Sequence, residues 1–465
     1  MSTLFYGLNI ASNALKTQSA VLNVTAHNIS NAETPGYSRQ TVAVESGAGA
    51  TSSIGITATS AITIGNGTFA NEVTRSRSKL YDDLYRTQNQ ELAYYDKTED
   101  LINQVELYFD EPSERGFSQV VNDFFNGWQE VSNDPQNTAA RQSLISYGEE
   151  LVDRLHRLYD QLDTLRKEID EEVATMPEYI NEITTEIAEL NGNIRSSENQ
   201  GLEANDLRDK RDYLVDQLSE YANVKAFEQS DGSYTIIIGS QVVVDREDHA
   251  ELQAVGSVDE DAGNIRTAIL TEEELEILPE KGRLGALIEF RDETIDAIID
   301  DLDTFTEALV TSVNYQHNYG YGLDGSTELN FFDPNYTKSF NIALSSDVED
   351  VNKIAVSGDS TYGDNSNALK INAIKNLDVI QNQYTLSEYY NALVSDIGIL
   401  GMSAQSGRTN EELLVSQIDN AREEIKGVST DSELIQMITS QRIYQGASRI
   451  ITVIDELLEQ VVNLT

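Results

Sequence analysis

The sequence predicts a mainly α-helical, elongated, multi-domain protein that carries one small β insert. Apolar residues recur at helical spacing at both ends of the 465-residue chain and again through its middle, at 151–194. Residues 224–284 change to strand-like alternation, with Asp231-Gly232 as a hairpin turn. The length allows about three domains. We therefore expect coiled-coil-like terminal helices, a long helical-bundle body and a β-rich insert domain.

The N-terminal segment predicts a seam-forming helix. Its apolar residues follow alternating steps of four and three, the spacing of a coiled-coil seam. The seam residues that we expect to serve assembly are Leu4, Leu8, Ala11, Leu15, Leu22 and Ile29. Residues 1–38 therefore form one half of a predicted terminal assembly domain.

A turn is expected to follow this helix at Thr34-Pro35-Gly36-Tyr37. Proline fixes the second position of a type II turn, and glycine accepts the positive φ that the third position requires. Pro35, Gly36 and Tyr37 are thus candidate turn residues. Residues 41–78, in which Ile54, Ile56, Ile62 and Ile64 alternate, predict an extended, partly β connector.

The body is predicted to comprise residues 39–223 together with 285–426. Its segments with helical spacing begin at Leu80 and return after the insert, and the whole set is 80–109, 151–194, 203–222, 285–318 and a last stretch from about 367. Residues 319–365 are rich in Gly, Asn, Asp and Tyr, so we expect an irregular excursion there.

The C-terminal segment, 427–465, is the second half of the predicted assembly domain. Apolar residues recur every seven positions and fill the complementary positions as well; the candidate assembly residues are Met437, Tyr444, Ala447, Ile451, Ile454, Leu458 and Val461. Further apolar residues at 443, 450, 457 and 464 widen this face beyond what one partner helix covers. We therefore expect packing between subunits rather than a purely internal core.

The charge balance excludes several classes of partner. The chain has 79 acidic and 32 basic residues, a formal net charge of −47. Such a surface repels phosphate, so we expect neither nucleic acid nor an anionic membrane as a partner. No run of about 18 apolar residues predicts membrane insertion. The N-terminus lacks the basic and apolar regions of a cleaved signal peptide, and the chain has no cysteine.

No catalytic, cofactor-binding or metal site is predicted. The four histidines are scattered without ligand spacing. The stretch Gly320-Tyr-Gly-Leu-Asp-Gly325 matches the dinucleotide fingerprint by letter, but it follows a helical stretch and leads into no helix. We expect no cofactor there.

Both ends resemble one known family. Gly7-Leu-Asn-Ile-Ala-Ser-Asn-Ala-Leu15 and Ala26-His-Asn-Ile-Ser-Asn-Ala-Glu-Thr-Pro-Gly-Tyr-Ser-Arg-Gln40 are similar to the N-terminal signature of flagellar rod, hook and hook-associated proteins. Gly427 to Glu433 and Tyr444 to Leu458 resemble the C-terminal signature of the same axial family.

Motifs in the body resemble the FlgK-type hook-associated branch of that family. They are Phe124-Phe-Asn-Gly-Trp128, Asn133 to Gln142, Ile187 to Asn191, Leu207-Arg-Asp-Lys-Arg-Asp212 and Gly363 to Ala368. Two departures stand out. Ser432-Glu433 replaces the pair of acids that members often carry, and the variable outer domain is missing or reduced around 319–365.

The resemblance implies a non-enzymatic structural subunit of the bacterial flagellum that forms the junction between hook and filament. It implies type III export, an extracellular location, a ring of copies of the chain itself, contacts with the hook protein and with the filament-side hook-associated protein, and an export chaperone. Two alternatives stay open. One is another axial component, such as a hook or rod subunit or the filament-side protein; the other is a secreted enzyme of axial ancestry.

Overall fold

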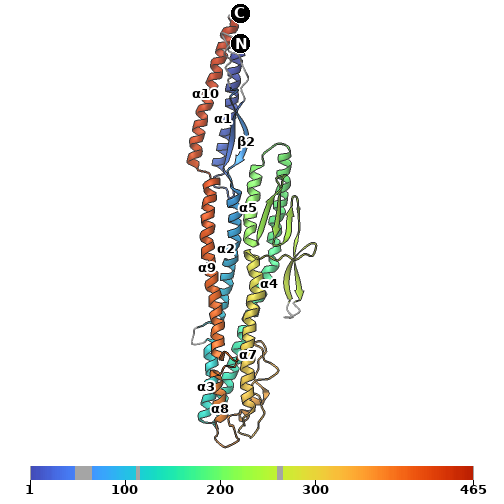
Figure 1. The fold of residues 1–465 in the computed structure, drawn as a ribbon, viewed down its shortest axis with the longest axis vertical. Coiled ribbons are helices and arrows are strands. Elements are labelled where there is room, and N and C mark those ends of the chain that lie inside the picture. The colour runs from blue at the N-terminus through green and yellow to red at the C-terminus, as the bar shows by residue number, and fades with distance from the viewer. Residues whose placement is uncertain (1, 48–64, 112–115, 259–264, 464–465) are drawn as a thin grey trace. The chain divides into compact units, whose positions relative to one another are not determined.

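The computed structural model describes residues 2–47, 65–111, 116–258 and 265–463, and it divides the chain into two compact units. Unit 1 comprises residues 1–90, 179–251 and 412–465, and unit 2 comprises 91–178 and 252–411. Helices dominate both units, which confirms the mainly α prediction (Figure 1).

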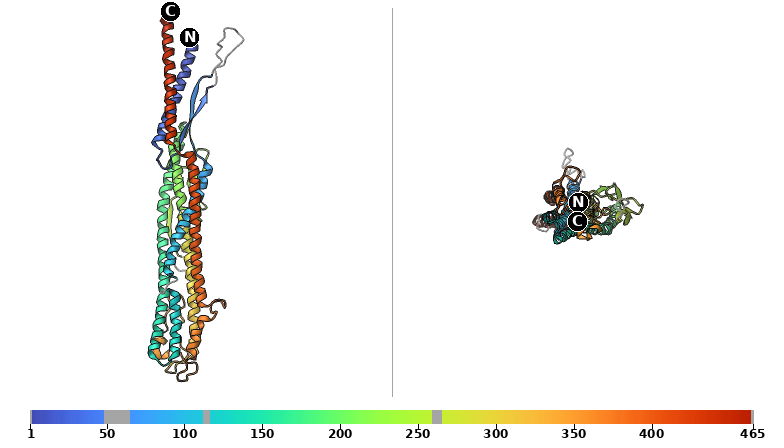
Figure 2. Two further views of the ribbon diagram at one scale, coloured as in Figure 1. Left: turned by 90° about the vertical axis from the view of Figure 1, so that its left-hand side faces the viewer. Right: turned by 90° about the horizontal axis from the view of Figure 1, so that it is seen from below.

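Two long helices from opposite ends of the sequence lie side by side in unit 1. They are α1 (Ser2–Ser30) and α10 (Thr430–Asn463). The pair is antiparallel, so the beginning of α1 and the end of α10 lie together (Figures 1 and 2). The strands β1 (Gln40–Ser46) and β2 (Thr68–Arg75) form an antiparallel hairpin beside α1. These strands confirm the extended connector at its two ends, whereas the four alternating isoleucines lie outside the described residues.

The remainder of unit 1 is built from parts of three long helices, one shorter helix and a four-stranded sheet. The long helices are α2 (Lys79–Phe109), α4 (Thr138–Asn199) and α9 (Leu386–Lys426), and the shorter one is α5 (Asn205–Tyr221). The sheet has the order β3-β4-β5-β6, with strands Val224–Glu228, Tyr234–Ile238, Gln241–Asp245 and Asp248–His249.

The predicted β insert, residues 224–284, is two separate sheets that belong to different units. Side chains of the helices hold each sheet. The Asn191 side-chain amide donates to the carbonyls of Tyr234 and Arg246, at 3.0 and 2.7 Å, in unit 1. In unit 2 the hairpin of β7 (Leu252–Val258) and β8 (Ile265–Thr271) is held by Asp170, which accepts hydrogen bonds from Thr267 N at 2.7 Å and Thr267 Oγ1 at 2.8 Å. The alternation correctly indicated strands, but it could not reveal these two anchors.

Unit 2 packs helices around an aromatic core. Besides its shares of α2, α4 and α9, its helices are α3 (Phe117–Asn133), α6 (Gly282–Glu289), α7 (Ile295–Asn318) and α8 (Ser366–Ala373). A single π turn, Phe290–Thr294, joins α6 to α7. Phe124, Trp128 and Phe331 are fully buried, and their rings contact one another in edge-to-face and tilted arrangements. Within the part of the chain that the structure describes, no helix is long and apolar enough to cross a membrane.

The irregular excursion at 319–365 is held by three buried polar side chains. Arg141 donates to the carbonyl of Ile354 at 2.7 Å, and Asn314 Oδ1 accepts from the backbone N–H groups of Phe331 and Phe332. His317 Nδ1 lies 2.7 Å from Leu329 O, and its Nε2 accepts from Ala355 N at 3.0 Å. Such side chains replace the regular backbone pairing that this segment lacks.

We predict that unit 2 loses stability as the pH falls below about 6. Burial lowers the pKa of His317 to about 4, against the weaker opposing effect of its bond to Leu329. Because the pKa of His317 in the folded state lies below its ordinary value, the neutral imidazole contributes its full share to the free energy of unfolding above about pH 6.5. This contribution is lost as the pH falls toward 4. The expected loss between pH 7 and pH 5 is about 2 kcal/mol. Urea unfolding followed by the fluorescence of Trp128, the sole tryptophan, measures it.

Two variants control this prediction. His317→Asn cannot titrate, so its stability should be lower at pH 7 but much less dependent on pH. His249→Gln changes an exposed histidine in unit 1 and should keep the wild-type dependence. An unchanged pH dependence in His317→Asn would contradict the assignment.

Candidate assembly site

The terminal helix pair, α1 with α10, buries only part of the predicted seam. Ala11, Ala447 and Ile454 are buried. Leu8, Leu15, Leu22 and Ile29 are half-buried on α1, and Met437, Ile451 and Leu458 are half-buried on α10. Tyr444 remains 41% exposed. The side chains of Leu4 and Val461 lie outside the described residues.

The most buried line of α10 contains two of the predicted residues and two that were not predicted. It consists of residues seven apart, namely Glu433, Ser440, Ala447 and Ile454. Ala447 and Ile454 were candidates, whereas Glu433 and Ser440 were missed because the prediction selected apolar side chains and the contact with α1 also uses polar ones. Gly7 on α1 shows how closely the helices approach, because a Cβ there would lie 3.3 Å from Ile454 Cδ1.

A fully bonded asparagine joins the helix pair to β1. Asn28 donates to Gln40 O at 2.9 Å and to Glu433 Oε2 at 3.1 Å. Its Oδ1 accepts from Gln40 N at 2.9 Å and from the Tyr37 hydroxyl at 2.8 Å. Arg39 completes the arrangement with an ion pair of 2.7 Å to the buried Glu433. Sequence reasoning missed both Asn28 and Glu433, although both lie within the motifs that it used for recognition.

The predicted turn is present. Gly36 has φ +77°, and Tyr37 N donates to Thr34 O at 3.2 Å, as expected for a type II turn with Pro35 at its second position. A Cβ on Gly36 would meet Tyr213 Cβ at 2.7 Å. Glycine is therefore required here both by the backbone conformation and by the close approach of α5.

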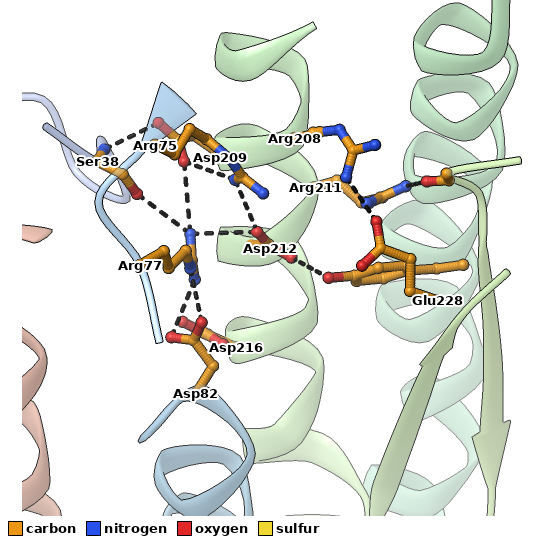
Figure 3. A network of polar contacts seen from close by, with 12 residues as sticks. Ser38, Arg75, Arg77, Asp82, Arg208, Asp209, Arg211, Asp212, Asp216 and Glu228 are labelled. Atoms are coloured by element: carbon orange, nitrogen blue, oxygen red, sulfur yellow. Dashed lines mark hydrogen bonds and ion pairs between the residues drawn. The ribbon is translucent and has the colours of Figure 1, made fainter. Parts of the chain in front are cut away.

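Eight charged side chains lie at the base of the terminal pair, and we call them the arginine–aspartate cluster (Figure 3). Six of them are buried, and Arg75 and Arg77 are half-buried. They come from β2 and the residues after it, α2, α5 and α9, and they are Arg75, Arg77, Arg86, Arg422, Asp82, Asp209, Asp212 and Asp216. Figure 3 labels all of them except Arg86 and Arg422. Asp216 bridges Arg86 at 2.7 Å and Arg422 at 2.5 Å. The cluster has four charges of each sign, so it is formally neutral.

The arginines keep the central aspartate ionised. Burial works to raise the pKa of Asp212, but the guanidiniums of Arg77, Arg75 and Arg86 outweigh it and hold that pKa below its usual value. Asp212 also accepts from the Tyr234 hydroxyl at 2.7 Å. Burial dominates at Asp209 and raises its pKa, although Arg75 and Ser38 oppose the shift. Ser38 N donates to Asp209 Oδ2 at 2.8 Å, which ties the segment after the turn to the cluster.

This arrangement can position helices, and it does not present reactive groups. Its carboxylates are occupied by guanidiniums, and among the described residues no group of three or more His, Asp or Glu side chains could hold a metal ion. The candidate assembly site therefore has two parts. The arginine–aspartate cluster fixes the position of the terminal helix pair, and the terminal helix pair exposes apolar surface.

Comparison with known protein families defines the class of protein to which this chain belongs. The family described as the helical domain of flagellar hook-associated protein FlgK matches residues 102–332. The flagellar basal body rod family matches residues 8–37, and the C-terminal family of the rod and hook proteins FlgEFG matches residues 421–464. The fold and the paired ends are thus those of a flagellar axial protein.

Full-length relatives narrow this class. Flagellar hook-associated protein 1 of Bacillus subtilis is 28% identical over 100% of this chain and 99% of its own length. The protein of the same name from Salmonella typhimurium is 24% identical over 98% of this chain and 99% of its own. The solved hook junction protein FlgK of Burkholderia pseudomallei shares the fold, with a TM-score of 0.66 and 16% identity, covering 75% of this chain and all of that one. The chain belongs to the FlgK-type hook-associated protein family.

The cluster itself was not predicted. Leu207-Arg-Asp-Lys-Arg-Asp212 served only as a family motif, yet it supplies Asp209 and Asp212. The available signal was its alternation of basic and acidic residues on a helix with few apolar positions. In a chain with 79 acidic residues, that signal does not distinguish buried carboxylates from exposed ones.

We predict that Asp216→Asn destabilises unit 1 by about 3–5 kcal/mol, because it leaves Arg86 and Arg422 buried without their shared partner. Amide hydrogen exchange in α5 measures the loss. The matched control is Glu186→Gln, which removes an exposed pair with Lys210 and should cost less than about 1 kcal/mol. Equal losses in the two variants would count against a buried cluster.

We also predict that Gly36→Ala costs more stability than Gly201→Ala. Both glycines have positive φ, +77° and +76°, but no atom lies within 4 Å of a Cβ on Gly201. The control should cost about 1 kcal/mol from backbone strain alone, and the clash with Tyr213 adds to that at Gly36. Gly36→Val should be worse still, because valine is β-branched. Hydrogen exchange in α1 and α5 is the measurement, and equal effects at the two glycines would contradict the close approach.

Proposed function

We propose that this chain is a structural subunit of the bacterial flagellum that joins hook to filament by assembling through its terminal helix pair. One observation carries the assembly role: α10 exposes two groups of large apolar side chains in an otherwise acidic protein. We call them together the α10 stripe and define it by Ile435, Ile438, Ile450, Val453 and Leu457, which are 43–67% exposed. Exposed apolar groups of this kind mark an interaction site.

The first half of the stripe lies opposite the buried line of α10, and the second half lies beside that line. Successive residues of an α-helix turn by about 100°, so Ile435 projects about 160° from Glu433, whereas Val453 projects about 100° from Ile454. The helix therefore packs on α1 with one side and presents the stripe on the remaining surface. We assign residues 1–38 with 427–465 to an assembly domain on this ground, residues 39–223 with 285–426 to the body, and residues 224–284 to the β-rich insert.

The family names suggest the partners. The relatives are named as hook-associated proteins and the solved neighbour as a hook junction protein. By analogy we propose contacts with further copies of this chain, with the hook protein and with the filament-side hook-associated protein. Export of the unfolded chain by the type III apparatus, without cleavage of a signal peptide and with the help of a chaperone, follows from the same analogy.

The alternative axial roles receive less support. The ends match models shared by rod and hook proteins, but the match at 102–332 is to the helical domain of FlgK. The family is one of flagellar structural proteins, and we propose a non-enzymatic role for this chain.

The test uses a motile strain of the source bacterium from which this chain has been deleted. We expect cells that make hooks, release filament protein into the medium and carry no attached filaments, with recovery on expression of the wild-type chain. Ile438→Asp with Val453→Asp should fail to restore attachment, because two carboxylates would then enter a desolvated contact.

Two controls accompany this experiment. The purified variant should keep the helicity and melting behaviour of the wild type, since both positions are exposed. Leu278→Asp with Leu369→Asp changes two exposed leucines of unit 2 and should restore filaments. Attached filaments in the deletion strain would refute the junction role, and full recovery with the α10 variant would refute assembly through this stripe.

A further inference from the structure

Two arginines stand between the apolar residues of the α10 stripe, on the same face of the helix. From Leu434 to Ile454 the only charged residues are Arg442 and Arg449. Both are exposed, and neither forms an ion pair or a side-chain hydrogen bond among the described residues. Seven residues separate them, which places them on one face about 10.5 Å apart. This 21-residue segment carries +2 in a chain whose formal net charge is −47.

A glycine stands between the two arginines on the same face. Gly446 lies four residues after Arg442 and three before Arg449. No neighbouring atom lies within 4 Å of the place where its Cβ would stand, so packing within the chain does not require a glycine. A glycine inside a helix costs about 1 kcal/mol relative to alanine. Its absent side chain leaves room for another surface to approach the helix backbone.

Elsewhere on unit 1 a groove of about 730 Å³ has the complementary character. Glu72, Glu203 and Asp206 line it, and no lysine or arginine does. Its walls are largely apolar and come from α1, the β1–β2 hairpin and the segment before and at the start of α5: Ala20, Val24, Val42, Val73, Leu202 and Leu207. Leu202 is 61% exposed, so the groove has apolar surface that the chain itself does not cover.

Two carboxylates of the groove lie against each other. Burial, and then repulsion by Glu72, raises the pKa of Glu203. Neither carboxylate forms an ion pair with a lysine or arginine among the described residues. An incoming guanidinium would relieve this repulsion, because it supplies the opposite charge and several donors in one plane.

We propose that the groove of one copy receives the α10 stripe of a second copy, with Arg442 and Arg449 against Glu72 and Glu203. The second copy is the chosen occupant because this chain itself carries the matching shape and charge: an apolar helix face with two free arginines and an apolar groove with unneutralised acids. Stripe and groove are different surfaces of the same unit, so the contact is heterologous. Repeated from copy to copy, such contacts generate rings or helical arrays. The inference rests on the proposed function and names the contact through which the copies join.

Charge reversal provides the test in the deletion strain. The stripe variant carries Arg442→Glu with Arg449→Glu, and the groove variant carries Glu72→Lys with Glu203→Lys. All four positions are exposed, so both variants should fold like the wild type by circular dichroism and thermal melting. Each variant alone should reduce the number of attached filaments at least tenfold, since like charges then face each other across the contact.

Two combinations test the pairing of stripe with groove directly. A chain that carries all four changes should recover filaments. Expression of the stripe variant together with the groove variant should also recover them, because each reversed helix then meets a reversed groove on another copy. Rescue by the mixture is possible only if the contact joins different copies.

Complementation by the wild-type chain shows whether a negative result contradicts the proposed function or only the contact between stripe and groove. If it does not restore filaments, the proposed function is wrong. If it does, and the stripe variant fails while the groove variant works, the stripe contacts the hook or filament-side protein and the inference is overturned. Full activity of the stripe variant, or failure of both combinations in folded protein, overturns it as well.

A covalent test is also available because the natural sequence has no cysteine. Ile450→Cys lies on the stripe and Leu202→Cys in the groove, and both positions are exposed. Oxidation of flagella that contain both single variants should give a disulfide-linked dimer. The control replaces Leu202→Cys with Lys225→Cys, an exposed position on β3 outside the groove, and should give none. Equal yields from the two mixtures, or no dimer in flagella that retain filaments, would contradict the contact.

Discussion

The buried arginine–aspartate cluster is the constraint on which the rest of unit 1 depends. Four guanidiniums and four carboxylates leave water together, and each would be costly to bury alone. Asp216 needs Arg86 on α2 and Arg422 on α9, while Asp212 needs Arg75 and Arg77. Any displacement of one segment leaves a charge unpaired. The cluster therefore fixes which segments meet and in what register, and apolar packing alone would not do so.

A series of hydrogen bonds connects the arginine–aspartate cluster to the two terminal helices and fixes their register as well. Asp209 accepts from Ser38 N, and Asp206 accepts from the Gln40 side chain at 2.7 Å. Gln40 is bonded to Asn28 on α1, which is bonded to Glu433 on α10. Every one of these contacts is a hydrogen bond with defined geometry, so together they fix the position of the terminal helix pair relative to α5. The apolar surface of α10 is then free for contacts outside the chain, because it is not needed to define the internal fold.

The sequence predicted the elements better than their contacts. Helical and period-two patterns located both terminal helices, most of the body helices and the strands, because burial of one face imposes those periods. They did not indicate α3. At the seam they included Ala447 and Ile454 but missed the buried polar residues Glu433 and Ser440. They also failed at 224–284, where Asn191 and Asp170 divide the strands between two units. Pairing of a polar side chain across 43 or 97 residues leaves no periodic trace, so the cluster and the anchors of the excursion could be found only in the structure.

The distribution of charge explains why assembly surfaces of this chain must be exceptional. Unit 2 contains 49 acidic and 16 basic residues, and unit 1 contains 30 and 16. Copies of such a chain repel one another, but at physiological salt that repulsion is screened beyond about 8 Å. Local charge at the contact therefore decides whether copies can join. Residues 434–454 carry no acid, and the groove near Glu203 carries no base. Electrostatics then favours contact between these two surfaces and disfavours contact between acidic bodies, which would give the proposed association a direction as well as an affinity.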